Sequence, residues 1–134
     1  MRLVVDANVL FSALLKAGMT RKLVFDRRLV LFSPRFLLKE FEKYASELEK
    51  RSGLKKDDFL ELAELMLSRI NLIPDDEITP FIPAAKHLSK DENDIAYAAC
   101  ALAVDAELWT SDRHLIQPRI RVWNTAQLVE QLGA

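Results

Sequence analysis

The chain has 134 residues, of which half are hydrophobic and 29% are charged, and its formal net charge is −1. This length and composition indicate one folded domain over residues 1–134 and exclude an intrinsically disordered chain. The near-neutral charge excludes a global basic field, so nucleic acid would have to bind at a local patch.

The single cysteine, Cys100, lies in an alanine-rich stretch and is expected to be a small core residue. One cysteine excludes an internal disulfide and is compatible with a reducing cytoplasm. No apolar run approaches the ~20 residues that a membrane span requires, so we expect a cytoplasmic protein that does not bind a membrane.

Short apolar runs alternate along the chain with patterns typical of helices. Strands are predicted at Leu3–Val5, Leu29–Phe32, Ile70–Ile73, Leu108–Thr110 and Arg121–Trp123. Helices are predicted over residues 9–16, 20–27, 33–51, 55–69, 79–87, 90–104 and 125–132. The first strand shows no alternation of polar and apolar residues, which is typical of a strand buried on both faces. The alternation of strands and helices predicts an α/β fold with a parallel sheet and helices on both faces.

Several residues predict where helices begin and end. Gly18 is predicted to close the first helix in a left-handed conformation, and Gly53 is predicted to end the long helix. Ser33 is predicted as the N-cap of that long helix, with Pro34 at its first position. Thr20 is predicted to cap the short second helix.

Four acids are candidate site residues. Asp6 directly follows the first strand, and Asp112 follows the fourth. Asp94 lies near the start of the alanine-rich helix, and Glu40 lies in the long helix. In open parallel sheets, ligands bind at the carboxyl edge, where strands give way to helices. We therefore expect the polar groups at this edge to carry the function.

Each of these acids also has an ordinary explanation. Asp6 and Asp112 can be helix N-caps, and Asp94 can favour the positive end of its helix. Glu40 can be a solvated charge on an amphipathic helix, although its apolar neighbours are not typical of a solvated face. Taken singly, none of the four acids identifies an activity.

In their order along the chain, these segments resemble the PIN-domain family over about residues 3–125. The resemblance rests on Asp6 in Val5-Asp6-Ala7-Asn8, Glu40 in the helix after the second strand, Asp94 in Asp91-Glu92-Asn93-Asp94-Ile95-Ala96, and Asp112 in Thr110-Ser111-Asp112. It implies a three-layer sandwich whose five-stranded parallel sheet has the order 3-2-1-4-5, with four acids meeting at one edge. It also implies a metal-dependent endoribonuclease similar to the VapC-type toxins of toxin–antitoxin pairs.

The resemblance implies that Asp6, Asp94 and Asp112 are ligands of Mg²⁺ or Mn²⁺. Glu40 would bind the metal through water or act as a base that orients the nucleophile. Carboxylates gathered in one place repel one another and lose hydration unless a cation joins them, which agrees with this placement. Ligands that are all oxygen favour Mg²⁺ or Mn²⁺ over zinc, and the sequence has no Cys/His set with zinc-site spacing. The expected supporting residues at the same edge are Asn8, Thr110, Ser111 and Asp91.

The expected substrate is single-stranded or looped RNA, because an acidic edge has to reach a backbone phosphate. Local phosphate contacts are expected from Arg21, Lys22, Arg27, Arg28 and Arg113. The ordinary explanation of each is a solvated surface charge.

Two other classes of function stay open. Aspartyl-phosphate phosphatases need a second Asp two residues after the first, where this chain has Asn8. A receiver-like switch needs its phosphorylated acid after strand three, where Asp75 and Asp76 stand behind a proline. The remaining alternative is a PIN-like module that binds nucleic acid without catalysis.

The helix over residues 55–69 predicts a contact between two copies of the chain. It carries a broad apolar stripe and one leucine, Leu65, among the residues of its polar side. The preceding helix adds more apolar surface than one sheet face readily covers. We therefore expect a two-fold homodimer through these helices. PIN proteins are often dimers through this region, and the resemblance to VapC-type toxins also implies a cognate antitoxin protein.

Overall fold

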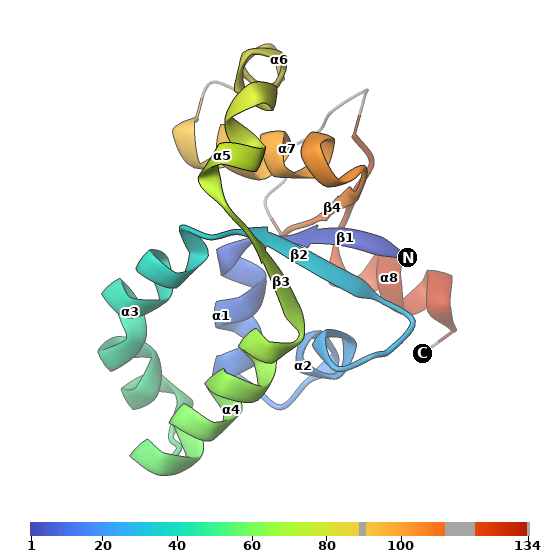
Figure 1. Cartoon of the computed structure of the whole chain (residues 1–134). Coiled ribbons are helices and arrows are strands. Elements are labelled where there is room, and N and C mark those ends of the chain that lie inside the picture. The colour runs from blue at the N-terminus through green and yellow to red at the C-terminus, as the bar shows by residue number, and fades with distance from the viewer. Residues whose placement is uncertain (89–90, 112–119, 134) are drawn as a thin grey trace.

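The computed structural model describes residues 1–88, 91–111 and 120–133, which form an α/β three-layer sandwich (Figure 1). All neighbouring strands of its five-stranded sheet are parallel, and their order is β3-β2-β1-β4-β5. The strands are β1 (Arg2–Val5), β2 (Val30–Pro34), β3 (Ile70–Ile73), β4 (Glu107–Trp109) and β5 (Val122–Trp123). The predicted fold class and strand order are therefore confirmed.

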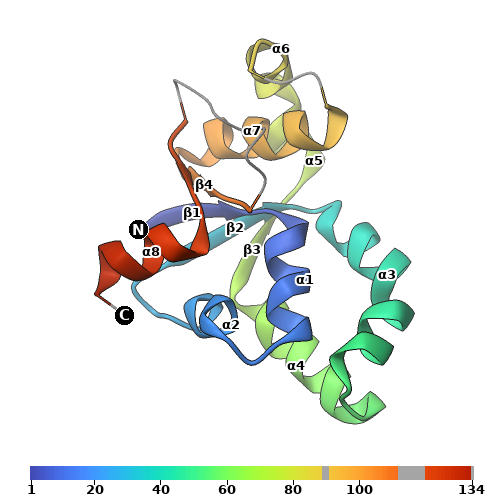
Figure 2. The same cartoon turned by 180° about the vertical axis from the view of Figure 1, so that it is seen from behind.

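Helices cover both faces of the sheet (Figures 1 and 2). One face carries α1 (Ala7–Leu15), α2 (Met19–Val24), α3 (Leu37–Ser52), α4 (Lys56–Ser68) and α8 (Thr125–Leu132). The other face carries α5 (Asp75–Ile78), the 3-10 turn η1 (Thr79–Phe81), α6 (Ile82–Lys86) and α7 (Glu92–Val104). The chain passes from β1 to β3 over the first face and returns to β4 over the second. The winding direction thus changes between β1 and β4, where a crevice is expected at the carboxyl edge.

The core lies on both sides of β1. Leu3, Val4 and Val5 are fully buried, which confirms that the absence of alternation marks a central strand. Helix α7 packs on the sheet through small side chains, because Ala98, Ala99 and Ala101 are all buried. Cys100 is buried beside them, as expected, and burial raises the pKa of its thiol to about 12. None of the helices within the described ranges is long and apolar enough to cross a membrane.

The predicted start of the long helix is wrong by a few residues. Ser33 and Pro34 belong to β2, where they pair with Leu72 and Ile73 of β3. The Ser33 hydroxyl is buried and donates a hydrogen bond to the Val5 carbonyl at 3.1 Å, so it is not available as a cap. Pairing with β3 and the Ser33 hydrogen bond to β1 hold these residues extended, and α3 begins only at Leu37.

Other helix boundaries also differ from prediction. Gly18 has a φ of −124°, so it does not close α1 in a left-handed conformation as predicted. Gly18 is also the N-cap of α2, the position that was predicted for Thr20. Gly53 does adopt the left-handed conformation at the end of α3, with a φ of 71°. The helical turns predicted to start at Thr79 begin earlier, at Asp75.

The strand order excludes a receiver-like switch. That fold has the order 2-1-3-4-5, which places strand three at the centre of the sheet. Here β3 is an edge strand, and Asp75 and Asp76 lie exposed in α5 beyond it. The receiver-like interpretation is therefore wrong.

The side chain of Arg69 fastens the end of α4 to the connection between α2 and β2. Its guanidinium donates hydrogen bonds to the carbonyl oxygens of Val24, Asp26 and Leu29 at 3.1, 3.0 and 3.2 Å. The connection has little regular secondary structure. The bonds from Arg69 therefore satisfy carbonyl oxygens that are not paired within a strand or a helix.

We expect Arg69→Ala to lower the free energy of unfolding by about 2 kcal/mol, because carbonyl groups lose a charged donor. Arg69→Lys should recover only part of this loss, since an ammonium group cannot reproduce the planar fork. Urea denaturation measures the effect, with Lys50→Ala on exposed helix surface as the control, which should stay within about 0.5 kcal/mol of the parent. An Arg69→Ala variant that matches this control would show that the tether contributes nothing.

Candidate functional site

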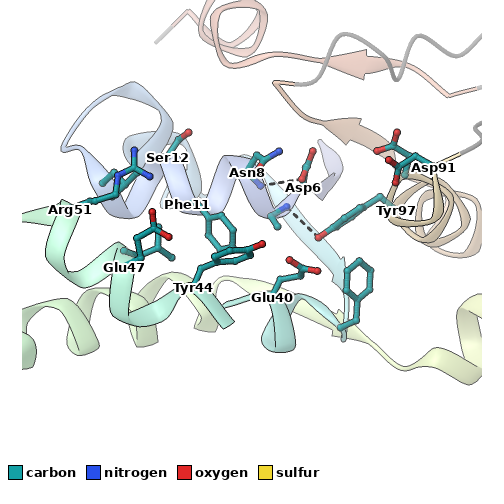
Figure 3. A pocket seen from close by; sticks show the side chains of 15 residues that line it. Asp6, Asn8, Phe11, Ser12, Glu40, Tyr44, Glu47, Arg51, Asp91 and Tyr97 are labelled. Atoms are coloured by element: carbon teal, nitrogen blue, oxygen red, sulfur yellow. Dashed lines mark hydrogen bonds between the residues drawn. The ribbon is translucent and has the colours of Figure 1, made fainter. Parts of the chain in front are cut away.

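A pocket of about 710 Å³ opens at the carboxyl edge of the sheet and continues between α1 and α3 (Figure 3). Its acidic lining residues are Asp6, Glu40, Glu47, Asp91 and Asp94. Its remaining lining residues are Ala7, Asn8, Phe11, Ser12, Leu15, Phe36, Tyr44, Leu48, Arg51 and Tyr97. Helix α7 forms the third wall, so the pocket lies where the winding of the sheet changes direction.

Asp6 is both a helix cap and a wall of the pocket. It follows β1 as the N-cap of α1, and its side chain is only 7% exposed. Oδ1 accepts a hydrogen bond from the Asn8 backbone N–H at 3.0 Å, and Oδ2 accepts one from the Thr110 hydroxyl at 2.6 Å. The ordinary explanation of Asp6 is therefore confirmed, and it does not compete with a role in the pocket.

The contact between Thr110 and Asp6 follows from the strand register. Val5 of β1 pairs with Trp109 of β4, so the next residues of the two strands are level with each other. The Asp6 backbone N–H also donates to the Trp109 carbonyl at 3.1 Å. Thr110 is 2% exposed, and its buried hydroxyl fixes one carboxylate oxygen of Asp6. Thr110, one of the predicted supporting residues, thus lies beside Asp6 at the sheet edge.

The structure brings three of the four predicted acids to this pocket. Glu40 lies half-buried in the first turn of α3, and Asp94 lies half-buried in the first turn of α7. Asp91, one of the predicted supporting residues, lines the pocket just before α7. Ser111 is exposed after β4 and is not part of the lining. Asp112, the fourth acid, lies outside the described residues.

Tyr97 is a site residue that sequence analysis missed. Its side chain is 3% exposed, and its hydroxyl oxygen accepts a hydrogen bond from the Ala7 backbone N–H at 3.3 Å. Burial raises the pKa of this hydroxyl, and the negative charges of Asp6 and Glu40 raise it further. Tyr97 lies one helical turn after Asp94, so helical spacing from the predicted acid identifies it.

Helix α3 contributes a second set of residues that were missed. Tyr44, Glu47 and Arg51 line the pocket beyond Glu40. Their spacing from Glu40 places them on the same face of the helix. This spacing can be read from the sequence. The Tyr44 ring meets Phe11 of α1 edge-to-face, with 5.7 Å between the ring centroids. These residues extend the acidic edge into a groove with aromatic walls.

Most of the predicted phosphate contacts lie away from this pocket. Arg21 donates hydrogen bonds to the carbonyl oxygens of Ala13 and Leu14 at 2.7 and 3.2 Å, at the C-terminal end of α1. Lys22, Arg27 and Arg28 are exposed and do not line the pocket, and Arg113 is outside the described residues.

Arg28 instead forms an ion pair with Asp26, at 2.7 Å between Nη2 and Oδ2. Hydrogen bonds from the Arg28 side chain and backbone lower the pKa of Asp26 to about 2. Arg51 is the one basic residue in the described lining of the pocket.

The donor set has the chemistry of a magnesium or manganese site. Asp6, Glu40 and Asp94 offer only carboxylate oxygens, which these hard cations prefer. Within residues 1–88, 91–111 and 120–133, however, no three His, Cys, Asp or Glu side chains form a group that could hold an ion. The described acids therefore fit such a metal in kind, and a complete site needs a further donor or a closer approach of these acids.

Comparison with known protein families and structures gives two matches. The model of the PIN-domain family matches residues 4–133. A solved structure, described as VapBC2 from Rickettsia felis bound to a DNA fragment from their promoter, contains a chain similar in fold. The TM-score is 0.70 at 19% sequence identity, and the match covers 92% of this chain and 98% of the other. Comparison with curated proteins gives no match.

The two hydrogen bonds of Asp6 predict how substitutions there affect stability. We expect Asp6→Asn to leave the free energy of unfolding almost unchanged in EDTA, because Asn is an equally good N-cap and the Thr110 hydroxyl can rotate to accept from an amide. Asp6→Ala removes both acceptors and should cost about 1–2 kcal/mol. Denaturation by urea compares the two variants. An Asp6→Asn loss as large as that of Asp6→Ala would show that the charge itself stabilises the fold.

Proposed function

Because this chain belongs to the PIN-domain family, we propose that it is a metal-dependent endoribonuclease that hydrolyses phosphodiester bonds of RNA. The observation that carries the proposal is that Asp6, Glu40 and Asp94, which lie far apart in sequence, line one pocket at the carboxyl edge of the sheet. Helix capping does not account for Glu40, because the N-cap of α3 is Phe36 and no side chain caps that helix.

In this proposal Asp6, Asp94 and Asp112 hold Mg²⁺ or Mn²⁺, and Glu40 either contacts the metal through water or acts as a base. When bound, such an ion polarises the scissile phosphate and lowers the pKa of a coordinated water. The Asn8 N–H and the Thr110 hydroxyl hold the Asp6 carboxylate in a fixed orientation. Glu40, on the opposite wall, is half-buried, and in the base role its carboxylate would accept a proton from the attacking water.

The pocket itself gives a reason to prefer catalysis over binding alone. Five carboxylates and one guanidinium line the described part of it. A polyanion is repelled from such a surface in the absence of cations, because like charges at short range destabilise a complex. A module that only bound RNA would have no use for this charge, whereas a metal-dependent nuclease requires it.

We expect cleavage of single-stranded RNA to require Mg²⁺ or Mn²⁺ and to be lost in Asp6→Asn, Asp94→Asn and Asp112→Asn. We also expect Mn²⁺ to raise the melting temperature of the parent protein, since an ion that binds only the folded state stabilises it, by roughly 2.7 kcal/mol at about 100 times the dissociation constant. That rise should disappear in Asp6→Asn.

Glu77→Gln is the matched control, because Glu77 is an exposed acid of α5, outside the pocket and away from α3 and α4. This variant should cleave RNA and respond to Mn²⁺ like the parent. Metal-independent cleavage, or no cleavage and no shift of melting temperature across millimolar Mn²⁺, would contradict the proposal. RNA binding that persists without any cleavage would point to the non-catalytic alternative.

We further propose that the chain forms a two-fold homodimer through α3 and α4. The apolar stripe of α4 faces inward, since Phe59, Ala63 and Met66 are buried. Leu60 and Leu65 remain on the outer side and are 47% and 52% exposed. Single exposed leucines are common, but two on one helix suit an isologous contact.

Light scattering at micromolar concentration should give twice the chain mass of 15.3 kDa. Leu65→Glu should convert the dimer to a monomer, because it places a charge in the apolar contact. Met19→Glu is the control, since Met19 is 37% exposed on α2, away from the proposed contact. A parent protein that is monomeric at this concentration, or a Leu65→Glu variant that stays dimeric, would count against the interface.

The likeness to the chain in the VapBC2 structure extends the proposal to a partner protein. We propose that this chain acts in the cytoplasm as the toxin of a toxin–antitoxin pair, with a cognate antitoxin that blocks cleavage. Co-expression of the neighbouring gene product tests this: the partner should copurify with the chain and suppress its ribonuclease activity.

A further inference from the structure

Tyr97 brings a buried hydroxyl to the acidic end of the pocket, and the proposed chemistry gives it no role. Its side chain is 3% exposed, and its ring packs against Phe36 with 5.3 Å between the ring centroids. In Figure 3 the hydroxyl reaches from α7 toward the middle of the pocket, between Asp6 and Glu40. A tyrosine held this firmly offers its hydroxyl at a fixed place.

The hydrogen bonds around Tyr97 direct its proton. The hydroxyl oxygen accepts from the Ala7 backbone N–H at 3.3 Å, which satisfies an N–H of the first turn of α1. The nearby Ser33 hydroxyl gives its own proton to the Val5 carbonyl. The Ser33 hydroxyl is also a hydrogen-bonding neighbour of the Tyr97 hydroxyl. The Tyr97 hydroxyl, which accepts from the Ala7 N–H, still has its own proton to donate, and a ligand in the pocket would compete with Ser33 for it.

The protonation state of Tyr97 suits a donor. Burial, followed by the charges of Asp6 and Glu40, raises the pKa of the hydroxyl above its ordinary value. The hydroxyl therefore keeps its proton to a higher pH than an ordinary tyrosine does. It is also uncharged, so it can stand beside carboxylates without forming an ion pair that would occupy it, as a lysine or arginine would.

We propose that the Tyr97 hydroxyl is a substrate-binding group that donates its hydrogen bond to a non-bridging oxygen of the phosphodiester bound in this pocket. The inference rests on the proposed function, because it assumes that a phosphodiester occupies the site. The proposed hydrogen bond from Tyr97 of α7 is a substrate contact in addition to the roles of the four predicted acids. A neutral donor contributes to phosphate binding where the acidic lining would repel a free anion.

Tyr97→Phe tests this contact, because it removes only the hydroxyl oxygen and its proton. We expect the affinity for a fluorescently labelled single-stranded RNA, measured by anisotropy in Ca²⁺ to slow hydrolysis, to fall about tenfold, the loss of one hydrogen bond to a charged group. With Mn²⁺ in place of Ca²⁺, kcat/KM for cleavage should fall by a similar factor. The melting temperature should fall only slightly, since the Ala7 N–H loses one acceptor.

Ser68→Ala is the control, because it also removes one hydrogen-bonding hydroxyl, and Ser68 is exposed on α4 and is not part of the pocket lining. It should keep the parental RNA affinity and kcat/KM. A Tyr97→Phe variant with a lower melting temperature but unchanged RNA affinity and kcat/KM would overturn the inference and leave Tyr97 as a purely structural contact to Ala7. A parent protein that neither binds nor cleaves RNA would refute the proposed function, and this inference with it, so the two failures are distinguishable.

Discussion

The hydrogen bond from the Thr110 hydroxyl to Asp6 joins the ends of the two strands between which the sheet changes direction. Its length of 2.6 Å and its burial make it a strong contact between a neutral donor and a carboxylate. The second oxygen of Asp6 is held by the first turn of α1. The carboxylate thus has one orientation, set by β1, β4 and α1 together, and every other group of the pocket is arranged around it.

This arrangement lets one residue serve the fold and the candidate chemistry together. A cap needs an acceptor that faces the helix N-terminus, and a pocket acid needs an oxygen that faces the crevice. At the end of a central parallel strand these two directions nearly coincide, because the helix starts where the crevice opens. The same geometry recurs at α7, whose first turn carries Asp94 toward the pocket. The acids are therefore brought together because their helices start at the sheet edge, and no separate loop is needed to position them.

The parts of the fold that could be predicted are those set by local pattern. The uninterrupted apolar run at Leu3–Val5 was enough to identify a central strand, because a strand buried on both faces has no polar positions. Ser33 and Pro34 were assigned wrongly because local signals favour a cap there, whereas pairing with β3 and the bond from the Ser33 hydroxyl to β1 hold them extended.

In the candidate site, the acids were found by their order along the chain, and Asp6, Glu40 and Asp94 do share one pocket. Tyr97 and Arg51 were missed because a tyrosine in an alanine-rich helix and an arginine near a helix end have ordinary explanations. Only the packing of α3 and α7 beside α1 shows that they line the same cavity as the acids. Conversely, Arg21 was expected at a phosphate but is engaged by the end of α1, a contact between neighbouring helices that sequence spacing does not predict.

Cys100 has a practical consequence for spectroscopy. It is the chain's single cysteine, it is fully buried in α7, and the pKa of its thiol is raised to about 12. Because the thiolate is the form that reacts with maleimides, the native chain offers these reagents almost no target. A cysteine introduced at an exposed position of α3 or α4 would then be labelled selectively on an otherwise unaltered background. Paired fluorophores or spin labels at such positions can report distances across α3 and α4 without first removing a native thiol.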